Sequence, residues 1–242
     1  MASGDFTDLK EWSARTARFD VSNSTDMALA GQAVNDAYIS TCADGSPWDF
    51  LQQEGSWITS SGSDVYTYAT IASAMSITGA SIAEIQMLAQ DNPQGRPLES
   101  MGWEELENYS HSTQDDPTGE PIYWSKWASR IRLWPTPDAA YTLGTFVRLA
   151  PAEMSASGDV PLIPLSWRRR LLVPFAAAIL LRTEGGLETA AEARGLMESY
   201  DRDFIAFRTA YATAKKPTFR VTSPGWAAID DNRSGSVFGA GW

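Results

Sequence analysis

The chain has 242 residues, of which 43% are hydrophobic, and it carries a formal net charge of −11 with a pI near 4.5. This hydrophobic content is normal for a globular protein with a packed core. The acidity disfavours wrapping of DNA or RNA and docking on anionic lipid, because both depend on cationic side chains that meet phosphates. It is consistent either with simple solubility or with a surface that DNA slides past.

The cysteine content and the apolar stretches indicate a soluble, cytoplasmic protein. Cys42 is the only cysteine, so no intrachain disulfide can form. The first five residues contain an acid and no apolar run, which is unlike a signal peptide. The longest apolar stretch, residues 171–181, is far shorter than the roughly 20 residues that cross a bilayer. We therefore expect no membrane partner.

Two helices are predicted before residue 48. Apolar positions spaced among charges over residues 5–20 are typical of a short amphipathic helix. Ser22-Asn23-Ser24 then offers an N-cap, and a second helix is predicted over residues 25–43. The run Asp44-Gly45-Ser46-Pro47 ends it, since glycine and proline follow helices.

Between residues 48 and 151 the pattern changes to that of strands. Residues 57–59 and 65–68 flank a turn-rich run and predict a hairpin, and residues 80–89 predict a strand.

A second hairpin is predicted later in the same region, with residues 130–134 and 141–149 joined by Pro135-Thr136-Pro137-Asp138. A short helix over residues 101–109 and a polar loop over 110–120 precede it.

Helical patterns return after Pro164. A helix is predicted over residues 167–182, capped by Ser166 and kinked or offset at Pro174. Gly185-Gly186 ends it, and a long helix follows over residues 187–214. Seven positions of this last helix alternate in spacing between three and four and predict one core-facing stripe. They are Ala190, Ala193, Met197, Tyr200, Phe204, Phe207 and Tyr211.

These elements predict an α+β fold with three parts. Residues 1–47 and 152–216 form a helical bundle, residues 48–151 form a β-rich insertion, and residues 217–242 form an extended C-terminal arm. The arm is rich in Gly, Ser, Ala and Asp, yet it carries spaced aromatic residues that disordered tails lack. These are Phe219, Trp226, Phe238 and Trp242. We expect them to be anchors through which the arm becomes ordered when it binds a partner. The alternative is that the arm packs back on its own subunit.

Signatures of catalysis, metal binding and cofactor binding are missing. His111 is the only histidine and lies in the predicted polar loop, and the sequence contains no HExxH, CxxC or GxSxG motif. Phosphate-cradling glycine motifs are missing too. We therefore expect no catalytic residues, no metal and no cofactor.

Two alternative functions remain open at this point. The first is a carboxylate-based cell-wall hydrolase, because glycoside hydrolysis needs only two acids at a set separation. The cluster Glu104-Glu105-Glu107 is more typical of a solvated helix face. The second is a tryptophan-rich module that binds carbohydrate or protein. Core packing is the simpler interpretation for the tryptophans at element edges or apolar faces. These are Trp12, Trp103, Trp134 and Trp167.

One dense basic cluster stands out, formed by Arg168, Arg169 and Arg170. At the start of a helix these cations oppose the helix dipole. The cluster predicts a partner-binding role toward acids of the same or a neighbouring subunit, or toward DNA phosphate; the alternative is that the arginines are simply exposed beside an apolar helix.

Several short motifs follow one another in order between residues 45 and 212. They are Gly119-Glu120-Pro121-Ile122-Tyr123-Trp124, Ile131-Arg132-Leu133-Trp134-Pro135-Thr136-Pro137-Asp138, Tyr141-Thr142-Leu143, Asp159-Val160-Pro161-Leu162-Ile163-Pro164, and then an alanine-rich helix. Each is degenerate alone. As an ordered set they resemble the head-to-tail adaptor (connector) proteins of tailed bacteriophages.

The resemblance implies a structural protein of the virion and not an enzyme. It implies a ring, usually of twelve subunits, which lies under the portal and extends the DNA channel. The implied partners are the portal protein ring, copies of the chain itself and the next neck or tail protein, while double-stranded DNA passes without specific binding. The implied location is the head–tail junction, after assembly in the host cytoplasm.

Overall fold

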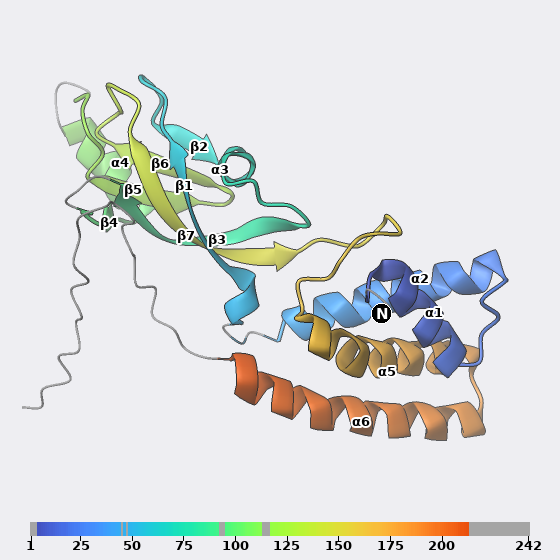
Figure 1. Cartoon of the computed structure of the whole chain (residues 1–242). Helices are drawn as coiled ribbons and strands as arrows, with labels where there is room; N and C mark the ends of the chain where they lie inside the picture. Colours follow the sequence, from blue (N-terminus) through green and yellow to red (C-terminus); the bar gives the residue numbers. More distant parts are fainter. Residues whose placement is uncertain (1–3, 45, 47, 92–94, 113–116, 213–242) are drawn as a thin grey trace, which may run out of the picture.

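The computed structural model describes residues 4–44, 46, 48–91, 95–112 and 117–212. It confirms the α+β class: helices from the two ends of the described chain form a bundle, and the chain between them forms a β-rich part (Figure 1). The predicted arm, residues 217–242, lies outside the described residues. The helices of the bundle are α1 (Phe6–Thr16), α2 (Ser24–Cys42), α5 (Leu165–Glu184) and α6 (Leu187–Tyr211).

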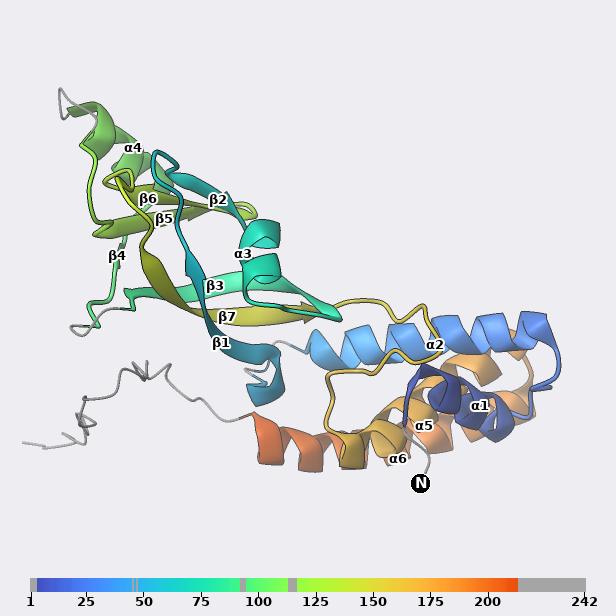
Figure 2. The same cartoon turned by 45° about the horizontal axis from the view of Figure 1, so that its top comes forward.

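The β-rich part contains seven strands, one 3₁₀ turn and two short helices among the described residues. They are η1 (Asp49–Leu51), β1 (Gln52–Ile58), β2 (Val65–Thr67), α3 (Tyr68–Ala74), β3 (Ala80–Gln90), β4 (Glu99–Ser100), α4 (Trp103–Ser112), β5 (Tyr123–Trp127), β6 (Arg130–Trp134) and β7 (Thr142–Pro151). Figure 2 shows the bundle and the β-rich part at opposite ends of an elongated molecule.

Side-chain caps explain where the first two helices begin. The Asp5 carboxylate accepts a hydrogen bond from the Asp8 amide before α1, and the Asn23 side chain accepts one from the Thr25 amide before α2. Such caps are worth about 1 kcal/mol each. Both predicted helices are confirmed, and α2 ends at Cys42, just before the predicted stop.

Helix α5 begins earlier than predicted. The Trp167 amide donates to the Pro164 carbonyl at 2.9 Å, so the first turn already includes Ser166, and the predicted Ser166 cap is wrong. The helix continues through Pro174 and ends at Glu184, and its C-cap Gly185 has a φ of 67°, which favours glycine.

Helix α6 lays most of its predicted stripe on the bundle core. Ala193, Tyr200 and Phe207 are buried, whereas Ala190 is exposed at the first turn. The partly buried members Met197, Phe204 and Tyr211 pack against the same core. The helix ends at Tyr211 rather than at residue 214.

Both predicted hairpins are wrong in their pairing. The strands form two sheets, in the orders β1-β7-β3 and β2-β6-β5-β4. Strand β1 therefore pairs with β7 and not with β2, and β6 pairs with β5 and β2 and not with β7. The predicted strand at 80–89 is confirmed as β3.

Each predicted turn instead carries the chain from one sheet to the other. The two connections run side by side: the Gly62 amide donates to the Pro137 carbonyl at 2.7 Å, and the Leu133 amide donates to the Asp64 carbonyl at 2.8 Å. The turn residues do reverse the chain, as their chemistry requires. Strand β1 then pairs with β7 and β2 pairs with β6, in each case across more than 60 residues of sequence, while β6 also forms a hairpin with β5, its neighbour along the chain.

Helix α4 extends beyond its predicted end, and α3 has no counterpart in the prediction. Helix α4 runs to Ser112, so His111 lies in its last turn and not in a polar loop. Helix α3 is capped by the Thr67 hydroxyl, which accepts from the Thr70 amide at 3.1 Å. Residue Tyr68, predicted as strand, is its first residue.

Two clusters of buried side chains form separate cores, one in each part. Trp48 and Leu51, at the start of the β-rich part, belong to the core of the bundle. Leu162 packs against both cores. None of the described helices is long and apolar enough to cross a membrane.

Candidate functional site

The described residues carry surface groups of acids, tryptophans and arginines. No group of three or more His, Cys, Asp or Glu side chains among them is arranged to hold a metal ion. The acids of α4 take structural or solvated positions: Glu104 and Glu105 are exposed, and Glu107 pairs with Arg132. Arg132 also binds Asp64 at 2.9 Å, so its guanidinium joins α4 to the connection between β1 and β2.

Core packing was predicted for four tryptophans, and it is confirmed for two of them. Trp12 and Trp167 lie against the core of the bundle. Trp103 and Trp134 belong to neither core, and the ring of Trp134 instead meets that of Tyr109 edge to face, with the ring centres 4.8 Å apart.

The most exposed of the described tryptophans is Trp127, at 58%. It meets Trp103 edge to face, with an interplanar angle of 65°. These two rings therefore do not share the single plane on which a sugar ring stacks.

The arginine cluster makes several contacts within its own subunit. The Arg168 Nε donates to the Ile163 carbonyl at 2.8 Å, and burial lowers the pKa of its guanidinium. Arg170 binds Asp203 at 2.5 Å and lies 4.6 Å from the centre of the Trp167 ring.

Arg169 is the member of the cluster with most freedom to meet a partner. Its guanidinium lies 5.0 Å from the centre of the Trp12 ring. It is exposed, and it forms no ion pair with any residue that the structure describes.

A pocket of about 290 Å³ opens where the bundle meets the β-rich part. The end of α2 forms one side, and β3 and β7 form the other. Apart from Ser46 and Arg148 its lining is apolar. The lining residues are Ile39, Cys42, Ala43, Ser46, Trp48, Leu51, Ala83, Arg148, Leu149, Ala150 and Pro151. No sequence pattern indicated this pocket, because its walls come from segments far apart in the chain.

Comparison with protein families decides what kind of protein carries these surfaces. The model of one family, described as SU10 adaptor protein, matches residues 5–224. The chain belongs to the SU10 adaptor protein family. No curated protein is similar enough in sequence to count as a relative.

Membership in the adaptor family confirms the predicted resemblance. The chain is a bacteriophage adaptor, a structural component of the virion that interacts with other head or tail proteins. The match covers the bundle and the β-rich part and extends beyond Tyr211. It includes Phe219 and none of the three later aromatic residues of the arm.

Proposed function

We propose that this adaptor assembles with copies of itself into a ring below the portal at the head–tail junction, extends the DNA channel and docks the next neck or tail protein. The family match over residues 5–224 carries the proposal. The number of twelve subunits and the assembly in the host cytoplasm are part of the same proposal and come from the resemblance to head-to-tail adaptors. The elongated shape supports it, since two well-separated ends suit a protein that joins two different neighbours (Figure 2).

The charge of the β-rich part supports a channel through which DNA passes without binding. Residues 48–151 contain thirteen Asp and Glu against five Lys and Arg. A ring concentrates this charge around its axis. A wall of one sign repels the phosphates of the duplex and lets it move.

The three parts have separate roles in this proposal. The bundle of residues 1–47 and 152–216 and the insertion of residues 48–151 build the wall of the ring. The arm of residues 217–242 binds the portal or an adjacent subunit through Phe219, Trp226, Phe238 and Trp242. The arginines 168–170 contribute to contacts between subunits, chiefly through Arg169.

Electron microscopy of the chain mixed with its cognate portal tests the proposal. We expect a second ring stacked on one face of the portal ring, with a continuous central channel. The chain alone serves as the control, because an adaptor of this kind can stay monomeric until it meets the portal. Portal rings that remain bare at saturating adaptor concentration would contradict the proposal.

Binding to duplex DNA tests the channel separately. We expect the assembled ring to bind duplex more weakly than the roughly 10⁻⁴–10⁻⁶ M typical of non-specific DNA-binding proteins. Fluorescence anisotropy of a labelled duplex at low salt measures this. Micromolar binding that weakens steeply with salt would mean that cations, and not acids, line the channel.

A further inference from the structure

The pocket at the seam between the two parts is large enough for an aromatic side chain. Its volume of about 290 Å³ exceeds the roughly 150 Å³ of a protein cavity that binds benzene. Its apolar lining favours an apolar occupant, since burial of such surface is the main favourable term in association. Trp48 and Leu51 form part of this lining and also belong to the core of the bundle.

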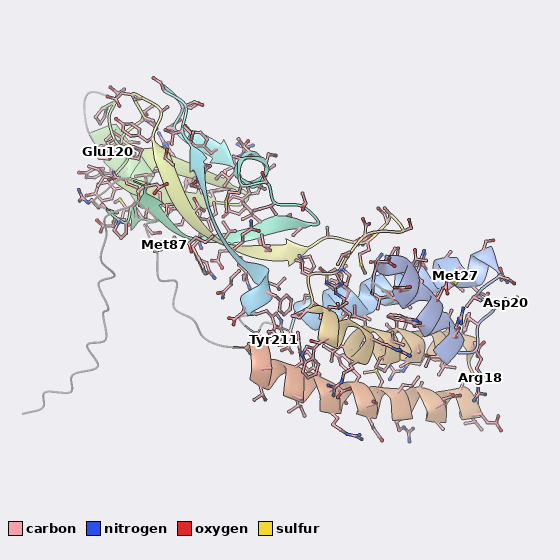
Figure 3. The ribbon with its side chains drawn as sticks, viewed as in Figure 1. Arg18, Asp20, Met27, Met87, Glu120 and Tyr211 are labelled. Carbon is pink, nitrogen blue, oxygen red and sulfur yellow. The ribbon has the colours of Figure 1, made fainter. Side chains whose placement is uncertain are left out.

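The described chain ends close to this pocket. Tyr211, at the end of α6, lies below the start of β1 (Figure 3). Its ring is 5.1 Å from that of Phe207, which is 4.9 Å from that of Trp48 in the pocket wall. Two ring contacts thus link the end of α6 to the pocket.

The first aromatic residue beyond Tyr211 is within reach of the pocket. Phe219 follows Tyr211 by eight residues, which span at most about 29 Å when fully extended. The family match ends at residue 224, so Phe219 belongs to the part of the chain that the family shares. Trp226 and the two later aromatic residues do not.

Charges on the two sides are complementary. Lys215, Lys216 and Arg220 surround Phe219 in the sequence. Asp44 follows Ala43 of the lining and is exposed, so it is an acid beside the pocket that a basic segment can meet. Glu84, which follows Ala83, already pairs with Lys126 at 2.6 Å and with Arg148 of the lining at 3.6 Å. A basic segment is therefore attracted chiefly to Asp44.

We infer that Phe219 of the same chain fills this pocket, with the neighbouring cations near Asp44. The contact fixes the first residues of the arm, around Phe219 (the root of the arm), where the bundle meets the β-rich part. Trp226, Phe238 and Trp242 remain available for the portal or an adjacent subunit. The inference concerns the isolated chain, so it stands or falls independently of ring assembly.

The single cysteine provides the test, because Cys42 lines the pocket. In a purified full-length Phe219→Cys variant, oxidation with copper phenanthroline should link residues 42 and 219 within one chain. A disulfide requires Cα atoms within about 7 Å, so the bond reports contact. Non-reducing electrophoresis and mass mapping of peptides measure it. Phe238→Cys is the matched control, and we expect at least about tenfold less linkage there.

The outcomes separate the possible occupants of the pocket. If the Phe238→Cys variant formed the link to Cys42 as strongly as the Phe219→Cys variant, the assignment of Phe219 would be overturned. Covalent dimers in place of the intrachain bond would show a neighbouring subunit's arm in the pocket and overturn the assignment to the same chain.

A second measurement keeps the inference testable if Cys42 forms disulfides too slowly to be detected. Burial raises the pKa of its thiol to about 12, which disfavours the reactive thiolate. In the full chain, Phe219→Ser should uncover the pocket and raise the labelling rate of Cys42 by a thiol reagent at least about tenfold. A rate equal to that of the unaltered chain and of Phe238→Ser would overturn the inference.

Discussion

Replacing Phe207 with alanine is expected to lower the free energy of unfolding by about 3–5 kcal/mol. Phe207 is fully buried, and its ring lies within 5.7 Å of the rings of Trp48, Phe50, Trp167 and Tyr211. The change removes the side chain on which these four rings converge and leaves a cavity. Because a domain is typically stable by only about 5–15 kcal/mol, the loss should be evident as a large shift of the midpoint of denaturant unfolding.

The same helix offers the matched control. Ile205 lies two residues earlier on α6 and is 68% exposed. Ile205→Ala should change stability by no more than about 0.5 kcal/mol, because it creates no cavity. Similar losses from both variants would mean that the outer face of α6 is covered in solution, for example by another copy of the chain. A small loss from Phe207→Ala alone would contradict the described packing of α6.

The cluster around Phe207 also explains how the two parts are held together. Where the chain passes from the bundle to the β-rich part, the ring of Trp48 packs against Phe207 of α6, and β1 begins four residues later. On the return, the Asn35 side chain exchanges two hydrogen bonds of 3.0 Å with the backbone of Met154. The Tyr38 hydroxyl accepts from the Leu162 amide at 3.0 Å. Both crossings between the parts are thus fastened to helices of the bundle, and a load on one part is transmitted to the other.

Local chemistry was sufficient to predict the helices of the bundle. The Asn23 cap, the Gly185 stop and the stripe through Tyr200 are properties of neighbouring residues. Helix α3 was missed because its residues are small and its strand-like neighbours dominate the pattern. The signal that would have found it is the pair Thr67 and Thr70, in which the first hydroxyl caps the amide of the second.

Strand pairing and the pocket depend on contacts between distant segments. The turns at residues 60–64 and 135–140 have the composition of hairpins, yet each lies at a corner between two sheets. Whether such a turn joins two paired strands or two different sheets depends on how the second corner packs against the first, as in the hydrogen bond from the Gly62 amide to the Pro137 carbonyl. The pocket likewise brings Cys42 and Leu149 together across more than 100 residues. No window along the sequence contains that information.

The arginine cluster shows a different limit of sequence reasoning. The three adjacent cations predict a role toward acids of the same or a neighbouring subunit, or toward DNA phosphate, but consecutive residues of a helix point in different directions. Arg168 turns to the Ile163 carbonyl, and Arg170 turns to Asp203 on α6. Only Arg169 keeps an exposed guanidinium without an ion pair in the described part of the chain. A surface role for the cluster therefore reduces to one residue.

Deleting residues 218–242 should leave the bundle folded and abolish attachment to the portal. Helix α6 already ends at Tyr211, so the described cores lose none of their members. Circular dichroism and thermal unfolding should thus show the native helical content. Aromatic anchors at interfaces are often worth about 2 kcal/mol or more each, so loss of several should weaken binding at least about a hundredfold. Co-sedimentation with portal rings measures this, and unchanged attachment would refute a role for the arm.

Point variants separate the outer anchors of the arm from its root. Replacing Trp226, Phe238 and Trp242 together with serine keeps the length of the arm and also Phe219, and it should abolish portal attachment as the deletion does. A double variant, Ser234→Ala with Ser236→Ala, is the control and should bind normally, because it keeps every aromatic residue. If Phe219→Ser alone abolished attachment while the triple variant bound normally, the root of the arm would carry the binding. Full binding by the triple variant and by Phe219→Ser would place the portal contact on the folded body instead, where Arg169 is the first residue to test.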